Sequence, residues 1–319
     1  MMSNKYKPKE ININDFYLKH KNTPCIVVGS GHTMMNFDYK KFKGIVILVG
    51  SSIYRTRGKI NPDYLVTANN HHPIPEVSSH LKIINKFKNL TWIISDTACY
   101  DSIWNKNENI YKKNFKINYS FFDDRHFNNQ ECKPKKKCCE FIGKKKDGKM
   151  IFDQLAQKFK IKHNLLNQGV SVSDFGIAYA VLFGCNPIFI QGIDLPQNKY
   201  ISIYGKYYGS SNNKIDKFEQ EFNKSLRKKF FMYYLKNLNF YPYIQSFYEK
   251  IQARIFKKSI FYYDFLKTKK ILLWIKKISL KNDIKIYVLN EKSTLIKENI
   301  FEYLSPDKLK KKYKKMFRN

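Results

Sequence analysis

The sequence contains no run of about 18 uncharged apolar residues, the length that an α-helix needs to cross a bilayer. Its first ten residues, MMSNKYKPKE, also lack the apolar stretch of a secretory signal peptide. These two absences predict a cytoplasmic protein. Hydrophobic residues nevertheless make up 43% of the 319 residues, which is enough for the core of one large or two modest domains.

Cysteine is scarce, with six residues in the whole chain. Cys25, Cys99 and Cys185 stand singly in or beside apolar segments, as buried thiols of a reducing compartment do. The other three lie in the lysine-rich stretch 132–139, and their spacing is not that of a common zinc site. We therefore predict no metal site here and interpret residues 105–150 as a lysine- and cysteine-rich insertion.

Arginine is scarce as well: only six of the 59 basic residues are arginine, although the formal net charge is +33. The lysines are scattered along the chain, and no zinc-finger spacing or aromatic RNA-reading motif accompanies them. This pattern predicts no specific nucleic-acid recognition. It does predict attraction to anionic partners such as nucleotide phosphates, acidic glycans or the inner face of a membrane.

The most informative segment that the sequence does contain is the run 167–196, NQGVSVSDFGIAYAVLFGCNPIFIQGIDLP. Apolar residues at helical spacing predict a helix over 173–183 with one buried face, ended by Gly184. A continuously apolar strand follows from residue 188, and Asp194 comes soon after it. Because open α/β sheets bind ligands beyond the carboxyl ends of their strands, Asp194 is a candidate site residue. The alternative is an aspartate that caps a turn.

A matching half precedes this run near the N-terminus. The apolar strand 25–28 leads into a turn with the sequence GSGHT, where glycines let a backbone approach a phosphate closely. The turn lacks the third glycine of the dinucleotide-binding motif. Its residues Gly29, Ser30, Gly31 and Thr33 are nevertheless candidate phosphate ligands.

Three further apolar strands, 45–49, 64–67 and 91–94, each end in small or polar residues. Parallel strands that finish in this way build one polar rim along the carboxyl edge of a sheet. The pattern predicts an α/β fold with a Rossmann-like, mostly parallel sheet, flanking helices and a helical, basic C-terminal extension. The candidate residues of this rim are Ser51 after the first of these strands and Asn69, Asn70, His71 and His72 after the second.

The adjacent histidines, His71 and His72, invite a metal or a catalytic interpretation. Neighbouring side chains on an extended chain point to opposite sides, and no third ligand is evident, so we predict no metal there. Imidazole titrates near neutral pH, and a hydrogen-bonding or acid-base role is therefore the preferred interpretation.

The whole chain is expected to divide into three parts. Residues 1–205 are expected to form the nucleotide-binding core, 206–280 a lid and helical region, and 281–319 a returning strand with a basic tail. The amphipathic stretch 244–277 favours packing on the core, with a peripheral membrane contact as the alternative. The end of the tail, 308–318, is expected to be solvated, with anchoring to a surface as the alternative.

Three motifs resemble the family that groups archaeal 6-hydroxymethylpterin diphosphokinases with bacterial motility accessory factors, and more distantly the glycosyltransferase family 42 sialyltransferases. The first is the glycine turn, in which His32 and Thr33 replace the proline and serine of the family pattern. The second comprises Ile60, Pro62, Asp63 and Tyr64, followed by Asn69 where the family has an aspartate. The third and best matched comprises Gly169, Ser171, Val172, Gly184, Cys185, Pro187, Ile188, Gly192, Asp194 and Leu195.

The resemblance implies a transferase, and the missing carboxylate at Asn69 favours sugar transfer over Mg²⁺-dependent diphosphate transfer from ATP. The favoured reaction uses a nucleotide-sugar donor, with a cytidine-linked nonulosonic acid preferred, and modifies a surface glycan or protein. The alternatives are a 6-hydroxymethylpterin diphosphokinase-like enzyme that requires ATP and Mg²⁺, and a noncatalytic nucleotide-binding protein. We predict no metal ligand. The catalytic candidates are His71, His72 and Asp194, and the substrate-binding candidates are Gly29, Ser30, Gly31, Thr33, Ser51, Asn69, Asn70, Ser171 and Asp194.

Overall fold

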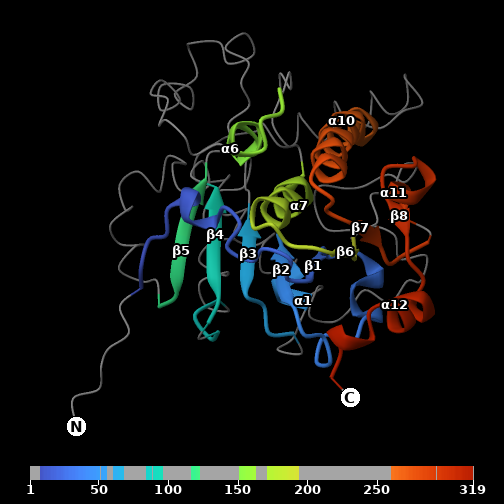
Figure 1. Ribbon diagram of the computed structural model, residues 1–319. Helices are drawn as coiled ribbons and strands as arrows, with labels where there is room; N and C mark the ends of the chain where they lie inside the picture. Colours follow the sequence, from blue (N-terminus) through green and yellow to red (C-terminus); the bar gives the residue numbers. More distant parts are fainter. Residues whose placement is uncertain are drawn as a thin grey trace, which may run out of the picture.

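A parallel sheet forms the centre of the protein. The computed structural model describes residues 8–50, 52–55, 60–67, 84–87, 89–95, 116–122, 151–162, 171–193, 260–291 and 293–318. Its eight strands follow the order β5-β4-β3-β2-β1-β6-β7-β8, and every pair of neighbours is parallel (Figure 1). The predicted α/β, Rossmann-like fold class is confirmed.

The bounds of the elements agree closely with the sequence pattern in the first half of the sheet. The strands are β1 (Cys25–Val28), β2 (Ile45–Val49), β3 (Tyr64–Thr67), β4 (Thr91–Ser95), β5 (Asn118–Phe122), β6 (Ile188–Gln191), β7 (Ile286–Val288) and β8 (Glu302–Tyr303). The helices are η1 (Ile13–Phe16), η2 (His32–Asn36), α1 (Ser52–Arg55), α6 (Ile151–Lys158), α7 (Val172–Leu182), α10 (Ile260–Lys281), α11 (Thr294–Lys297), α12 (Pro306–Lys312) and η4 (Lys314–Met316).

Strand β5 lies inside the range 105–150 that the sequence analysis assigns to an insertion. It pairs with β4 as an edge strand of the sheet, and Ser120 in its middle is fully buried. The sequence analysis overlooked this strand because its residues, NYSFF, are neither continuously apolar nor strictly alternating. Residues 116–122 are therefore part of the core, whereas the rest of 105–150 lies outside the described residues.

Two apolar layers cover the sheet because successive residues of each strand point to opposite faces. On one face Val27, Ile47 and Ile190 pack beneath α6, α7 and α10. On the other face Ile26 and Phe189 pack with residues of η2, α1 and α12. Strands buried on both sides explain why β1, β2 and β6 are almost continuously apolar.

Helix α7 is the central helix of the first layer. Gly176 lets it approach the sheet closely, because an added Cβ would lie 2.3 Å from Val49 Cγ1. Every residue of α7 from Ser173 to Leu182 is buried, rather than one face as the spacing predicted, since α6 and α10 pack on its remaining sides. The helix ends where expected, at Gly184, whose φ of +72° favours glycine.

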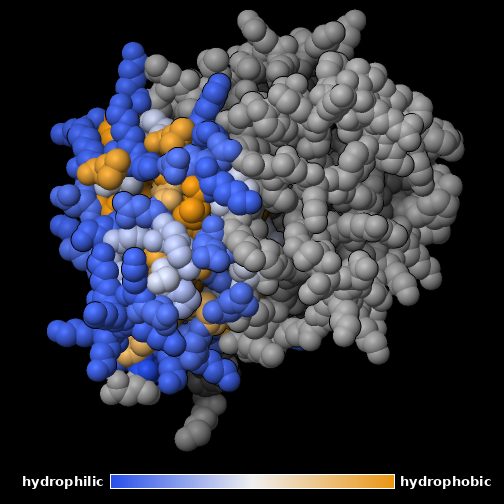
Figure 2. All heavy atoms as spheres, turned by 90° about the vertical axis from the view of Figure 1, so that its right-hand side faces the viewer, coloured by the Kyte–Doolittle hydropathy of each residue, from blue (hydrophilic) through white to orange (hydrophobic). Residues whose placement is uncertain are grey.

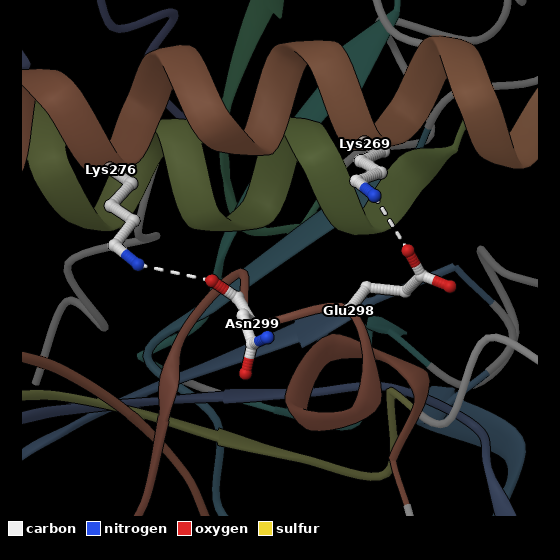
Figure 3. A network of polar contacts seen from close by, with 4 residues as sticks. All are labelled: Lys269, Lys276, Glu298 and Asn299. Carbon is white, nitrogen blue, oxygen red and sulfur yellow. Dashed lines mark hydrogen bonds and ion pairs between the residues drawn. The ribbon is translucent and has the colours of Figure 1, made fainter.

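Helix α10 packs on the core. This agrees with the preferred interpretation of the stretch 244–277, of which the structure describes the part from residue 260. Its buried face consists of Ile271, Leu272, Ile275 and Ile278. Lys269 forms an ion pair of 2.6 Å with Glu298, and Lys276 Nζ donates to the carbonyl oxygen of Asn299 over 3.1 Å. Figure 3 shows both lysines pointing from α10 toward the residues that follow α11.

The basic tail 308–318 is folded, and its lysines are exposed to solvent as expected. Leu309 is 4% exposed, and Phe317 forms an antiparallel bridge with Phe42. The backbone N–H of Arg318 donates to the carbonyl oxygen of Lys41 over 2.8 Å. The lysines of α12 remain exposed, so the tail combines an apolar inner side with a basic outer side.

The face that carries α10, α11, β8 and α12 is mostly hydrophilic, with separate apolar patches (Figure 2). The exposed large hydrophobic residues of the described chain are Leu273, Leu280 and Tyr303, and all of them lie on these C-terminal elements. In the part of the chain that the structure describes, no helix combines the length and apolarity that spanning a bilayer requires.

Candidate functional site

The strand order changes direction between β1 and β6. From β1 the chain adds β2, β3, β4 and β5 outward on one side, then returns to place β6 on the other side of β1. Ligands of open α/β sheets bind outside the carboxyl ends of the strands at such a reversal. The candidate site is therefore the carboxyl edge at β1 and β6, and the two glycine turns of the sequence follow these two strands.

The two turns are in direct backbone contact. Gly29 N–H donates to the carbonyl oxygen of Gln191 over 2.9 Å, and Gly31 N–H donates to that of Gly192 over 2.7 Å. A Cβ at Gly29 would lie 2.4 Å from the Gly192 oxygen, and a Cβ at Gly192 would lie 2.6 Å from the Gly29 oxygen. Gly192 also has a φ of +65°. Both positions therefore require glycine for steric reasons.

The side chains of the buried Gln191 and the half-buried Tyr39 donate hydrogen bonds to backbone carbonyl groups of the first turn. Gln191 Nε2 donates to the carbonyl oxygen of Thr33, and the Tyr39 hydroxyl donates to that of Met34 over 2.5 Å. Gln191 is 3% exposed, and its Oε1 has no hydrogen-bond partner among the described residues. Burial raises the pKa of Tyr39 further above its ordinary value, at which the hydroxyl is already a protonated donor at neutral pH.

A third loop reaches the same edge from β7. Ser293 is fully buried, and its Oγ donates to the carbonyl oxygen of Ile193 over 3.0 Å. Ser293 Oγ also accepts the N–H of Leu295 over 3.2 Å and so caps α11. Ser293 was not among the predicted site residues, although a serine before TLIK is a helix-start signal.

The N-terminus of α7 lies at this edge as well. Since α7 leads into β6, it runs against the strands, and Val172 Cγ1 lies 3.0 Å from where a Cβ of Gly50 would stand. Ser171 Oγ accepts the N–H of Ser173 over 3.3 Å and so caps the helix. The structure thus places the candidate Ser171 beside the end of β2 and gives its hydroxyl a capping role.

Asp174 completes a capping box at the same helix end. Its Oδ2 accepts the N–H of Ser171 over 3.3 Å and the hydroxyl of Thr268 over 3.2 Å. The carboxylate is fully buried, and the positive end of the helix dipole favours its negative charge. Because Thr268 belongs to α10, this contact joins the C-terminal helix to the candidate site.

The structure describes the positions of some of the predicted site residues, whose roles stay predictions. Gly29, Ser30, Gly31 and Thr33 form the turn beside β6, and Thr33 is 6% exposed. Ser171 lies near the neighbouring strand end. The other predicted residues lie outside the described part of the chain, namely Ser51, Asn69, Asn70, His71, His72 and Asp194.

The described part of the second sequence motif, 60–64, lies at the opposite edge of the sheet. Asp63 precedes β3, and its Oδ2 accepts the N–H of Val46 over 2.8 Å. Burial raises the pKa of Asp63. Tyr64 OH forms a 2.7 Å hydrogen bond with His20 Nε2, and burial, followed by the charge of Lys19, lowers the pKa of His20. Asp63 and Tyr64 therefore connect strands and do not line the candidate site.

Metal ligands do not gather in the described part of the structure, where no group of three His, Cys, Asp or Glu side chains could hold an ion. In the described part of this edge, the turn after β1 carries glycine backbone and the uncharged side chains of Ser30 and Thr33. Such groups suit an anionic ligand whose charge is bound by hydrogen bonds.

Comparison with known proteins gives a limited likeness. No protein-family model matches the chain, and no curated protein matches it in sequence. Among solved structures it is similar to the MAf glycosyltransferase from Magnetospirillum magneticum AMB-1, with 16% identity and a TM-score of 0.36. That match covers 61% of this chain but only 26% of the other, so this chain spans about a quarter of its length.

The chain is also similar to the sialyltransferase CstII from Campylobacter jejuni in complex with cytidine-5'-monophosphate. The identity is 13%, the TM-score is 0.38, and the match covers 90% of this chain and 87% of the other. A CstII complex with a trisaccharide acceptor and CMP gives 13% identity, a TM-score of 0.37 and coverages of 89% and 87%. TM-scores this low do not establish a common fold, and the resemblance to the diphosphokinase group stays a prediction.

Proposed function

We propose that this protein is a glycosyltransferase that transfers a sugar from a nucleotide-sugar donor, with a cytidine-linked nonulosonic acid preferred, to a glycan or protein. The main supporting observation is the contact between Gly29 and Gly192, which joins the predicted phosphate-binding turn to the run 167–196 at the strand reversal. Ligands of α/β sheets bind at this position, and glycine turns admit a phosphate close to the backbone.

The proposed chemistry needs a base and a stabilised leaving group. The acceptor hydroxyl forms a bond to the anomeric carbon of the sugar, while the bond from that carbon to the phosphate oxygen of the donor breaks. The hydroxyl proton goes to His71 or His72, and the nucleotide monophosphate leaves with the bonding electron pair. In this proposal the turn Gly29-Ser30-Gly31 with Thr33 stabilises the phosphate, Asn69 and Asn70 contact base or ribose, and Ser51, Ser171 and Asp194 complete the pocket.

A diphosphokinase-like activity is the second candidate, because the best-matched motif is shared with that family. It would require ATP and Mg²⁺, and Asn69 stands where the family pattern has a carboxylate. A noncatalytic nucleotide-binding protein is the third candidate. The same turn would then bind a nucleotide without turnover.

Thermal-shift measurements separate these candidates. The melting temperature of the full chain is measured with CMP, CDP, UDP, GDP or ATP, each with and without Mg²⁺. For each nucleotide that binds, hydrolysis of its activated form is then assayed. We expect stabilisation by CMP without Mg²⁺. Stabilisation by ATP with Mg²⁺ alone would contradict the sugar-transfer proposal, and no shift with any nucleotide would contradict the phosphate site.

The proposal includes a cytoplasmic location with a peripheral contact to an anionic membrane. Residues 260–318 contain 16 Lys or Arg but only six Asp or Glu. On α10, Leu273 and Leu280 are 41% and 68% exposed and lie two turns apart among the exposed lysines Lys270, Lys277 and Lys281. Leucines within a basic helix face favour an interface of anionic lipids, because apolar burial and charge attraction then act together.

A further inference from the structure

Two successive carbonyl groups of η2 accept hydrogen bonds from side chains outside that helix. Gln191 Nε2 donates to Thr33, and the Tyr39 hydroxyl donates to Met34. Gln191 is the last residue of β6, whereas Thr33 belongs to the turn after β1. The side chain therefore bridges the two strand ends at the candidate site.

The bridge of Gln191 complements the backbone contacts of the same turn. The N–H groups of Gly29 and Gly31 donate to the carbonyl oxygens of Gln191 and Gly192, and these bonds fix the first half of the turn. The second half, at Thr33, is bound by the Gln191 side chain. Gln191 at the end of β6 and Gly192 directly after it thus determine the backbone path from Gly29 to Thr33.

The orientation of the Gln191 amide follows from this contact. A carbonyl oxygen accepts but cannot donate, so the nitrogen of the amide must face Thr33. At 3% exposure the side chain has little room to turn over. The contact therefore requires a donor at position 191, and a side chain of the same size without that donor removes it.

We propose that Gln191 is a positioning residue for the phosphate of the ligand: through Thr33 it holds the turn Gly29–Thr33 in its phosphate-binding geometry. The inference rests on the proposed nucleotide site. It differs from a purely structural role, in which the Gln191 contact would contribute to stability and leave ligand preference unchanged. Positioning of the turn affects the phosphate of a nucleotide and leaves its nucleoside part unaffected.

The first test compares CMP with cytidine, which lacks the phosphate, by calorimetric titration of the full chain. Gln191→Met keeps the size but removes the donor. We expect this variant to weaken CMP binding about tenfold, because the turn loses one hydrogen bond that positions it. Cytidine binding should change less than about twofold. Tyr64→Phe is the matched control, since it deletes one buried hydroxyl at the opposite edge of the sheet and should leave both affinities unchanged.

The second test measures the CMP affinity of Gln191→Glu and of the wild type between pH 5 and 8. The affinity of the variant is divided by that of the wild type at the same pH, because this ratio cancels the titration of CMP itself. A protonated carboxyl group can donate its O–H to Thr33, but an ionised carboxylate facing that carbonyl oxygen cannot. We expect this affinity ratio to approach one near pH 5 and to fall at least about tenfold as the pH rises toward 8. A pH-independent ratio would contradict the inference.

The remaining outcomes distinguish this inference from the proposed function. If the wild type binds CMP and Gln191→Met keeps the wild-type ratio of CMP to cytidine affinity, the positioning role is wrong while the nucleotide site stands. If the wild type binds neither CMP nor any other nucleotide, both proposals are wrong. If Gln191→Met does not fold, the pH dependence of Gln191→Glu decides the question alone.

Discussion

The backbone N–H of Gly31 donates to the carbonyl oxygen of Gly192 over 2.7 Å, although the two glycines come from separate halves of the chain. Each of the two turns therefore depends on the other for its conformation. Any change that separates β1 from β6 at this edge should affect folding and ligand binding together.

Alanine at Gly192 should separate the two turns. Its Cβ would lie 2.6 Å from the Gly29 oxygen, and its φ of +65° disfavours any side chain. We expect Gly192→Ala to lower the free energy of unfolding by roughly 1–3 kcal/mol and to abolish the thermal shift with CMP. Urea unfolding and the thermal-shift assay measure the two effects.

Gly44→Ala is the matched control for this prediction. Its Cβ would lie 2.5 Å from the Pro24 oxygen, a similar clash, but at the amino edge of the sheet. It should reduce stability comparably while the folded protein retains its ligand affinity. Equal loss of ligand binding in both variants would contradict the assignment of the site to the carboxyl edge.

Thr268 should stabilise the contact between α10 and α7. Thr268→Val keeps the shape but leaves the fully buried Asp174 carboxylate without this donor. The expected loss in the free energy of unfolding is ~1–3 kcal/mol. Thr268→Ser retains the hydroxyl, and its free energy of unfolding should fall much less. If urea unfolding gives equal losses of stability for the two variants, the hydrogen bond contributes little.

Asp63 should make stability depend on pH in the acidic range. Burial raises the pKa of Asp63 above 3.8 in the folded protein, so the folded protein holds this proton more tightly than the unfolded chain does. The free energy of unfolding should therefore fall as the pH rises from about 3.8 through the folded pKa.

Asp63→Asn should remove this dependence while its side-chain oxygen still accepts the N–H of Val46. The stability of the variant relative to the wild type should rise with pH over that range and then level off. Urea unfolding between pH 3 and 8 measures the difference, and Asp307→Asn on the exposed side of α12 controls for the lost negative charge. A difference that stays flat would contradict the role of burial.

The exposed leucines of α10 should determine binding to anionic vesicles. Leu273→Ser and Leu280→Ser together leave the net charge unchanged, so any loss of co-sedimentation with phosphatidylglycerol vesicles reports apolar insertion. We expect a loss of several-fold, and no binding to phosphatidylcholine vesicles. Tyr303→Ser on β8 is the control; wild-type binding by the double leucine variant would rule out this helix face.

The strands and the central helix followed from local sequence. Continuous apolar runs at 25–28, 45–49 and 64–67 can be buried on both sides only in a sheet covered by helices, and β1 to β3 have these bounds. Likewise, Gly184 ends α7 because few other residues adopt its backbone conformation. These features depend on neighbouring residues, which the sequence shows directly.

Strand order and long-range contacts were decided by tertiary structure alone. The sequence marked Gly29 and Gly192 as turns, but only the placement of β6 beside β1 brings their backbones into contact. The same placement gives the Gln191 side chain its carbonyl partner at Thr33, and the pairing of β2 with β3 gives Asp63 its contact with Val46. Hydrogen bonds between distant segments depend on which strands are neighbours, and that choice is set by the packing of the whole core rather than by any local pattern.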